Sequence, residues 1–182
     1  MGMSYIYNEV EHLVKKYRSR NPFDILSAMN VVVKESGAYQ KLKGYCFSAN
    51  RTVYVVINET LHPAEKLIVA AHELAHIILH KNMLQMAPMK DSVLYDMKSE
   101  TEYEANLFAA DLLIADEDIS DMSKDEDMDY FKMCQCLNTS PDLMSFKLFS
   151  LIKRGYSYPM PPLDMNSTFL GKTTNANTIT ES

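Results

Sequence analysis

The chain begins with a helical pattern of apolar residues and then changes to a strand pattern. Apolar side chains recur at helical spacing between residues 4 and 18, which predicts an amphipathic helix. "NPFD" predicts a second, shorter helix, because Pro22 suits a first helical turn. From about residue 30 the chain has three β-branched and aromatic runs, "NVVVKE", "KGYCFS" and "RTVYVVIN". The last two flank "SANR", so we expect a small antiparallel sheet that contains one hairpin.

The second half of the chain returns to the helical pattern. Pro63 and Glu65 suit the start of a long helix, whose apolar residues keep a 3.6-residue rhythm to about Lys81. A loop with Pro88 follows. Three further helices are predicted, at about residues 99–115, 127–137 and 141–154.

These elements predict one α+β domain over residues 1–158. A chain of 182 residues that is 47% hydrophobic is long enough for one such core. The acidic segment 116–129 is most simply a solvated connector or a helix start. Residues 159–182 lose all periodicity, which predicts a flexible tail. Within the domain we expect N-terminal helices and the sheet at about 1–60, two central helices at about 63–115, and C-terminal helices at about 127–155.

Charge and composition exclude several classes of protein. The net charge is −6 and the basic residues are scattered, which argues against direct binding to nucleic acid. No uninterrupted apolar stretch is long enough for a membrane span, and the charged N-terminus does not resemble a secretion signal, so we expect a cytoplasmic protein. Three cysteines without a CxxC pair indicate neither a disulfide framework nor a cysteine zinc site.

One stretch of the long helix, "VAAHELAHIILH" from Val69 to His80, holds three histidines and a glutamate in an apolar run. His72, Glu73 and His76 match the pattern HExxH. On a helix, residues four apart differ by about 40° in direction and about 6 Å in height, so the two imidazoles can converge on one metal ion beside Glu73. This arrangement is typical of a zinc hydrolase with a carboxylate base. Burying these groups without partners is costly, so we expect Zn²⁺ here.

His80 is four residues from a histidine too, but it does not complete a second set. On a straight helix it lies about 12 Å along the axis from His72, too far for one zinc ion to bind both. The pair of His76 and His80 also has Ile77 where the base belongs. Two interpretations stay open: His80 is a polar neighbour at the rim of the site, or it interacts with the dipole at the helix end.

A catalytic zinc site needs a third protein ligand. A third histidine of the pattern HExxHxxGxxH is excluded, because Asn82 occupies its position. A glutamate from the next helix is the natural alternative. The helix at 99–115 offers Glu100, Glu102 and Glu104.

Helical periodicity ranks these glutamates. Glu102 lies about 50° from the centre of the apolar stripe, Glu104 about 110° and Glu100 about 150°. We therefore expect Glu102 to face inward as the third ligand, whereas Glu104 shares its direction with Asp111, which we take to mark the solvated side. Glu104 is the reserve ligand, because it is the next acid in the same segment. Asn106, one turn after Glu102, is positioned to hydrogen-bond a ligand histidine. The plainer interpretation of Glu102 is a first-turn carboxylate favoured by the helix dipole.

Peptide-bond hydrolysis at this site calls for two further features. The first is a donor to the oxyanion, for which Tyr95, Tyr103 and His80 are candidates, although a tyrosine here is more often part of the core or rim. The second is an exposed sheet edge that holds an extended substrate. We consider the strand of "TVYVVIN" for this role; plain core packing explains that strand equally well.

Several segments together resemble the ImmA/IrrE-type metallopeptidases, a gluzincin-like family of bacteria, their mobile elements and phages. The resemblance rests on "NPFDI", "KGYCFSANRTVYVVIN", "AAHELAHIILH", "ETEYEANLFAADLL" and "LNTSPDLMSFKLFSLIKRGY", and covers about residues 20–156. HExxH alone is weakly specific, but its pairing with the glutamate segment at this separation is a strong signal. Ala75 stands where the family often has glycine, which is a small departure.

The resemblance implies a zincin-like metallopeptidase fold, with His72, His76 and Glu102 as zinc ligands and Glu73 as general base. Family members cleave a DNA-binding transcriptional repressor, so the resemblance implies a regulatory zinc endopeptidase whose partner is a helix-turn-helix repressor. An acidic protease attracts a basic DNA-binding surface. The alternatives are a zinc-containing module, weakly active or inactive, that binds and sequesters a regulator, and a scaffold in which HExxH is accidental.

Overall fold

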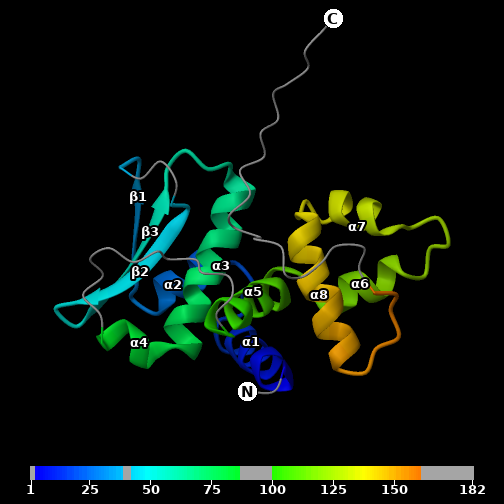
Figure 1. The fold of residues 1–182 in the computed structure, drawn as a ribbon, viewed down its shortest axis with the longest axis horizontal. Helices are drawn as coiled ribbons and strands as arrows, with labels where there is room; N and C mark the ends of the chain where they lie inside the picture. The colour runs from blue at the N-terminus through cyan, green and yellow to red at the C-terminus, as the bar shows by residue number, and fades with distance from the viewer. Residues whose placement is uncertain (1–2, 39–41, 87–99, 161–182) are drawn as a thin grey trace, which may run out of the picture.

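The computed structural model describes residues 3–38, 42–86 and 100–160. The described part of the chain is an α+β fold, as the sequence predicts. In Figure 1, α5 lies between a part built from the sheet and α3 and a part built from α6, α7 and α8. In chain order the elements are α1 (Met3–Tyr17), α2 (Pro22–Ala28), β1 (Val32–Ser36), β2 (Gly44–Ala49), β3 (Thr52–Asn58), α3 (Pro63–Leu79), α4 (Lys81–Met86), α5 (Glu100–Leu113), α6 (Asp116–Met122), α7 (Tyr130–Cys136) and α8 (Pro141–Lys153).

The sheet is mixed rather than purely antiparallel. Its strand order is β1-β3-β2, with β1 parallel to β3 and β2 antiparallel to it. The predicted hairpin is present: Ala49 pairs with Thr52, and Asn50 and Arg51 form the two-residue turn with φ of 51° and 64°. Of the two interpretations of "TVYVVIN", the exposed edge is wrong and the core strand is confirmed. That strand is β3, which is paired on both sides, and its three buried apolar residues belong to the core.

The start of α3 is fixed by its local sequence. Pro63 occupies the first turn, where a missing N–H costs nothing. The His62 side chain accepts from the backbone N–H of Ala64, while Glu65 reaches back to the backbone N–H of His62, which is the reciprocal arrangement of a capping box. From Ile68 onward nearly every residue of α3 is buried, because this helix packs on β2, β3 and α5. Polar groups on its second half are therefore held inside the protein.

The tight contact between β2 and α3 requires a small residue at Gly44. A Cβ atom there would lie 2.4 Å from Val69 Cγ1 and 3.0 Å from the backbone oxygen of Val56. The first approach is closer than carbon atoms pack, and the second is tighter than most Cβ contacts. Gly44 therefore lets β2 pass directly beside the helix turn that carries HExxH.

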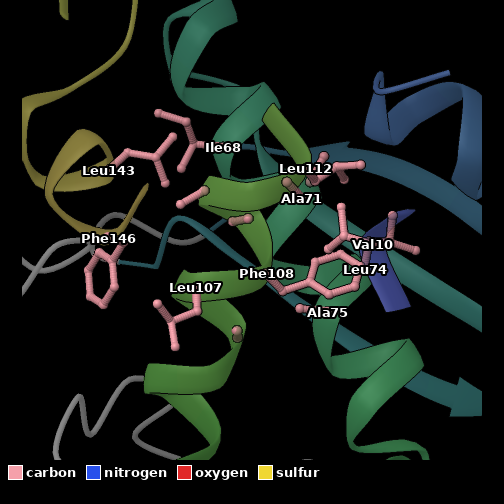
Figure 2. Close-up of a cluster of buried hydrophobic side chains, with 14 of the residues drawn as sticks. Val10, Ile68, Ala71, Leu74, Ala75, Leu107, Phe108, Leu112, Leu143 and Phe146 are labelled. Atoms are coloured by element: carbon pink, nitrogen blue, oxygen red, sulfur yellow. The ribbon is translucent and has the colours of Figure 1, made fainter. Parts of the chain in front are cut away.

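The core is centred on the packing of α3 against α5. Figure 2 shows Phe108 of α5 directed toward α3, where Leu74 and Ala75 face it. On another side of α5, Leu107 lies near Phe146 of α8. All five side chains are buried, with Phe108, Leu74 and Ala75 fully inaccessible. Small residues on both helices allow a close approach, which brings the polar residues of α3 and α5 within contact distance.

A buried charge network ties the end of α5 to α8. Lys147 is fully buried, and its Nζ lies 2.9 Å from Asp111 Oδ1 and 2.6 Å from Asp116 Oδ1. Ser150 donates to Asp111 at 2.7 Å, and Arg154 makes two hydrogen bonds to Asp116. The sequence-based assignment of Asp111 to a solvated side is wrong. Its carboxylate is buried because a lysine from a helix far along the chain neutralises it.

The structure differs slightly from the predicted helix bounds in the acidic segment and after it. The acidic segment begins as a helix, α6, and α7 starts at Tyr130 with Asp129 as its N-cap, later than the predicted residue 127. Among the described residues no helix combines the length and apolar character needed to cross a membrane. The loop with Pro88 and the part of the tail beyond residue 160 lie outside the described residues.

Candidate metal centre

His72 and His76 of α3 and Glu102 of α5 converge at one point. His72 Nε2 lies 3.1 Å from Glu102 Oε2, and His76 Nε2 lies 3.3 Å from Glu102 Oε1. The two Nε2 atoms are 3.1 Å apart. His72 is fully buried, while Glu102 keeps 7% of its surface exposed. Three side chains from two helices thus present two ring nitrogens and a carboxylate to a shared space.

The spacing of these donor atoms fits a small divalent cation. Nitrogen and oxygen ligands about 2.0–2.1 Å from a tetrahedral zinc ion lie roughly 3.3 Å from one another. The two ring nitrogens are 3.1 Å apart, and each lies at a similar distance from one Glu102 oxygen, 3.1 Å from Oε2 for His72 and 3.3 Å from Oε1 for His76. Among the described residues, His72, His76 and Glu102 form such a group, with ligand atoms all within 4.8 Å. Two imidazoles and one carboxylate also match the ligand set of catalytic zinc sites that leave a fourth position open.

The outer nitrogens of both histidines are engaged as well. His72 Nδ1 lies 2.9 Å from Asn106 Oδ1, and His76 Nδ1 lies 3.0 Å from His80 Nδ1. A metal ion bound at Nε2 of His72 would leave the ring proton on Nδ1, where the Asn106 oxygen can accept it. The contact with Asn106 is the one that helical periodicity anticipates.

The electrostatics of Glu102 and His76 are coupled. Burial alone raises the pKa of Glu102, but hydrogen bonds with His72 and His76 outweigh it and lower the pKa to about 2. Burial also disfavours the charged form of His76, yet its hydrogen bond with Glu102 and the charge of Glu73 leave the His76 pKa raised. Glu102 is therefore ionised across the physiological range. The centre offers a permanent negative charge to a cation.

Glu73 of α3 lies beside this centre, and its side chain is directed toward β2. It is 1% exposed, and its Oε1 is 3.6 Å from the position that a Cβ on Gly44 would take. Cys46 of β2 reaches the same carboxylate: burial raises the pKa of its thiol, and the charge of Glu73 and a hydrogen bond to it raise it further. The sequence gives no sign of this contact, because it depends on how closely β2 passes α3.

The other residues singled out in the sequence fall in different places. His80 caps α3 and contacts both His76 and Glu104, with His80 Nε2 at 2.9 Å from Glu104 Oε2. Glu104 is therefore turned to His80 and is not one of the three clustered side chains. Tyr103 packs its ring against Phe146 and Phe149 of α8, with centroids 5.8 and 6.3 Å apart, and burial raises its pKa to about 12. Tyr95 lies outside the described residues.

Comparison with known proteins agrees with this geometry. The chain is 36% identical over 107 residues to an uncharacterized immunity region protein 2 of Bacillus phage phi105. That match covers 59% of this chain and 66% of the relative, just under two thirds of its length. A family model described as Peptidase_M78, IrrE N-terminal-like domain, matches residues 28–148. This span includes the sheet, both helices of the metal centre and most of α8. The chain therefore belongs to the ImmA/IrrE-type peptidase family and has the α+β, zincin-like fold that its sequence predicts.

Proposed function

We propose that this protein is a zinc-dependent endopeptidase that cleaves a specific regulatory protein, such as a DNA-binding transcriptional repressor. The observation that carries the proposal is the convergence of His72, His76 and Glu102, at separations suited to zinc, beside the buried carboxylate of Glu73. Membership of a peptidase family supports the same chemistry. His72, His76 and Glu102 are the proposed ligands, and Glu73 is the proposed general base.

The chemistry divides between the metal and the protein. His72, His76 and Glu102 would hold a zinc ion, which when bound would supply Lewis-acid polarisation of the scissile carbonyl and a water with its pKa lowered toward about 7. Glu73 accepts the proton of the attacking water and then passes it to the leaving amine. The Cys46 thiol and the close passage of β2 keep the Glu73 side chain at the centre. Asn106 keeps the His72 ring directed at the shared space.

Two observations support a regulatory protein as the substrate. The relative from Bacillus phage phi105 carries the words immunity region in its name, which agrees with the repressor substrate that the family resemblance implies. The net charge of this chain is −6, which favours encounter with the basic surface of a DNA-binding protein. A helix-turn-helix protein encoded beside this chain is accordingly the first substrate to test.

Changing Glu73 to glutamine is expected to abolish cleavage without loss of the metal. Glutamine keeps the volume of the side chain but cannot accept the proton, so the rate should fall by at least about a hundredfold. The zinc-loaded protein is incubated with the neighbouring helix-turn-helix protein, and fragments are followed by mass spectrometry. Zinc content is measured on both forms so that they are compared at equal loading.

The outcomes separate an enzyme from a binding module. Cleavage by the unaltered protein and not by Glu73→Gln supports the peptidase. Equal cleavage by both forms contradicts the role given to Glu73. A stable complex that both forms make with an intact partner supports sequestration of a regulator instead.

A further inference from the structure

We propose that His80 and Glu104 are positioning residues that orient His76 toward the metal. The two side chains form a chain of contacts outward from the centre. His76 Nδ1 lies 3.0 Å from His80 Nδ1, and His80 Nε2 lies 2.9 Å from Glu104 Oε2. This inference rests on the proposed metal site, but it concerns affinity for the ion and not the identity of the substrate.

The donor and acceptor roles of His76, His80 and Glu104 fit together in only one arrangement when a metal ion is bound. When His76 Nε2 binds a metal ion, its remaining proton is on Nδ1, which must donate to His80 Nδ1. A neutral His80 that accepts at Nδ1 carries its own proton on Nε2 and donates it to the Glu104 carboxylate. Each ring thus uses one donor and one acceptor. Glu104, as an acceptor, fixes the tautomer of His80 and through it the tautomer of His76.

The surroundings make this arrangement specific. The side chain of His80 is 8% exposed and that of Glu104 is 13% exposed, so water competes poorly for these contacts. His80 is the C-cap residue of α3, and its backbone N–H is bonded to the His76 oxygen, which fixes its place one turn from the ligand. Glu104 is on α5, two residues after Glu102. The pair therefore joins the end of α3 to the same helix that supplies the proposed third ligand.

The contacts of His80 favour one of the two interpretations left open by the sequence, a polar neighbour at the rim of the site. An interaction with the helix dipole alone requires no hydrogen-bond partner on α5, whereas His80 contacts Glu104 of that helix. Glu102 contacts His72 and His76, whereas Glu104 contacts His80, so one helix supplies a carboxylate to the centre and a second carboxylate to its support. Support of a ligand histidine by an outer hydrogen-bond partner typically accounts for tenfold to a hundredfold in metal affinity.

The experiment measures zinc affinity by competition with a chelator, using the full chain. His80→Leu removes the acceptor and should weaken binding by about ten- to a hundredfold. His80→Asn places an amide oxygen near the former Nδ1, so it should recover part of the loss. Glu104→Ala should weaken binding by about tenfold, the low end of the same range. Glu100→Ala, an exposed carboxylate on the same helix, removes the same charge and serves as the control.

The decisive comparison is the double variant. If Glu104 acts through His80, adding Glu104→Ala to His80→Leu weakens zinc binding no further. The proposal is overturned if His80→Leu binds zinc as well as the unaltered protein, or if Glu104→Ala costs as much with His80 absent as with it present. Should His80→Leu fail to fold, the same cycle is run with His80→Asn. Because the readout is zinc affinity, failure to cleave a repressor leaves this result unaffected.

Discussion

Replacing Glu102 with alanine is expected to weaken zinc binding by more than about a hundredfold, beyond the range for residues that only support a ligand. Glu102 supplies oxygens at 3.1 and 3.3 Å from the two histidine nitrogens, and the hydrogen bonds from those histidines hold its pKa at about 2. Its removal leaves only two imidazoles as ligands and takes away the carboxylate that contacts both of them. Chelator competition measures the loss directly.

Glu104→Ala is the matched control, since it removes the same group from the same helix. Its effect should be smaller, because Glu104 contacts His80 and not the clustered donor atoms. The reverse order of the two losses would show that Glu104 is the ligand. In that case the direction assigned to Glu102 from helical periodicity would have no functional meaning.

Replacing Lys147 with methionine is expected to destabilise the protein by about 3–5 kcal/mol. Methionine keeps much of the length and the apolar stem but leaves the charge of Asp111, which is 1% exposed, without its closest cation. Asp116 loses the same partner and retains Arg154. A buried carboxylate that loses its cation keeps its full desolvation cost, which is the source of the large effect. Urea or thermal unfolding measures the change.

Lys153→Met on the same helix provides the control, because Lys153 is exposed and its loss should change stability by less than about 0.5 kcal/mol. Asp111→Asn combined with Lys147→Met should cost less than the sum of the single changes, since the two charges are removed together. Similar stabilities for the Lys147 and Lys153 variants would mean that the network contributes nothing. The network is also relevant to the site, because it anchors the far end of the helix that carries Glu102.

Much of the candidate site could be predicted because it depends on periodicity within single helices. HExxH places His72 and His76 on one face of a helix by spacing alone, and the apolar stripe of the next helix turns Glu102 and Asn106 inward. The structure has both of these residues buried, and Asn106 contacts His72. The roles given to these residues as ligands and supports stay predictions.

Features that depend on the meeting of distant segments could not be predicted. The position of β3 in the middle of the sheet follows from the parallel pairing of β1, which no local pattern encodes. The sequence predicts an exposed Asp111, because a charged residue is usually exposed, and its partner Lys147 is on another helix. The contact of Cys46 with Glu73 likewise depends on the approach of β2 to α3.

Zinc content tests the central claim most directly. The protein is purified, dialysed against excess Zn²⁺ and then against metal-free buffer, and analysed by elemental mass spectrometry beside a variant in which His72 and His76 are both alanine. The account predicts one zinc ion per chain in the unaltered protein and none in the variant. No zinc in the unaltered protein, or equal zinc in both, would contradict it.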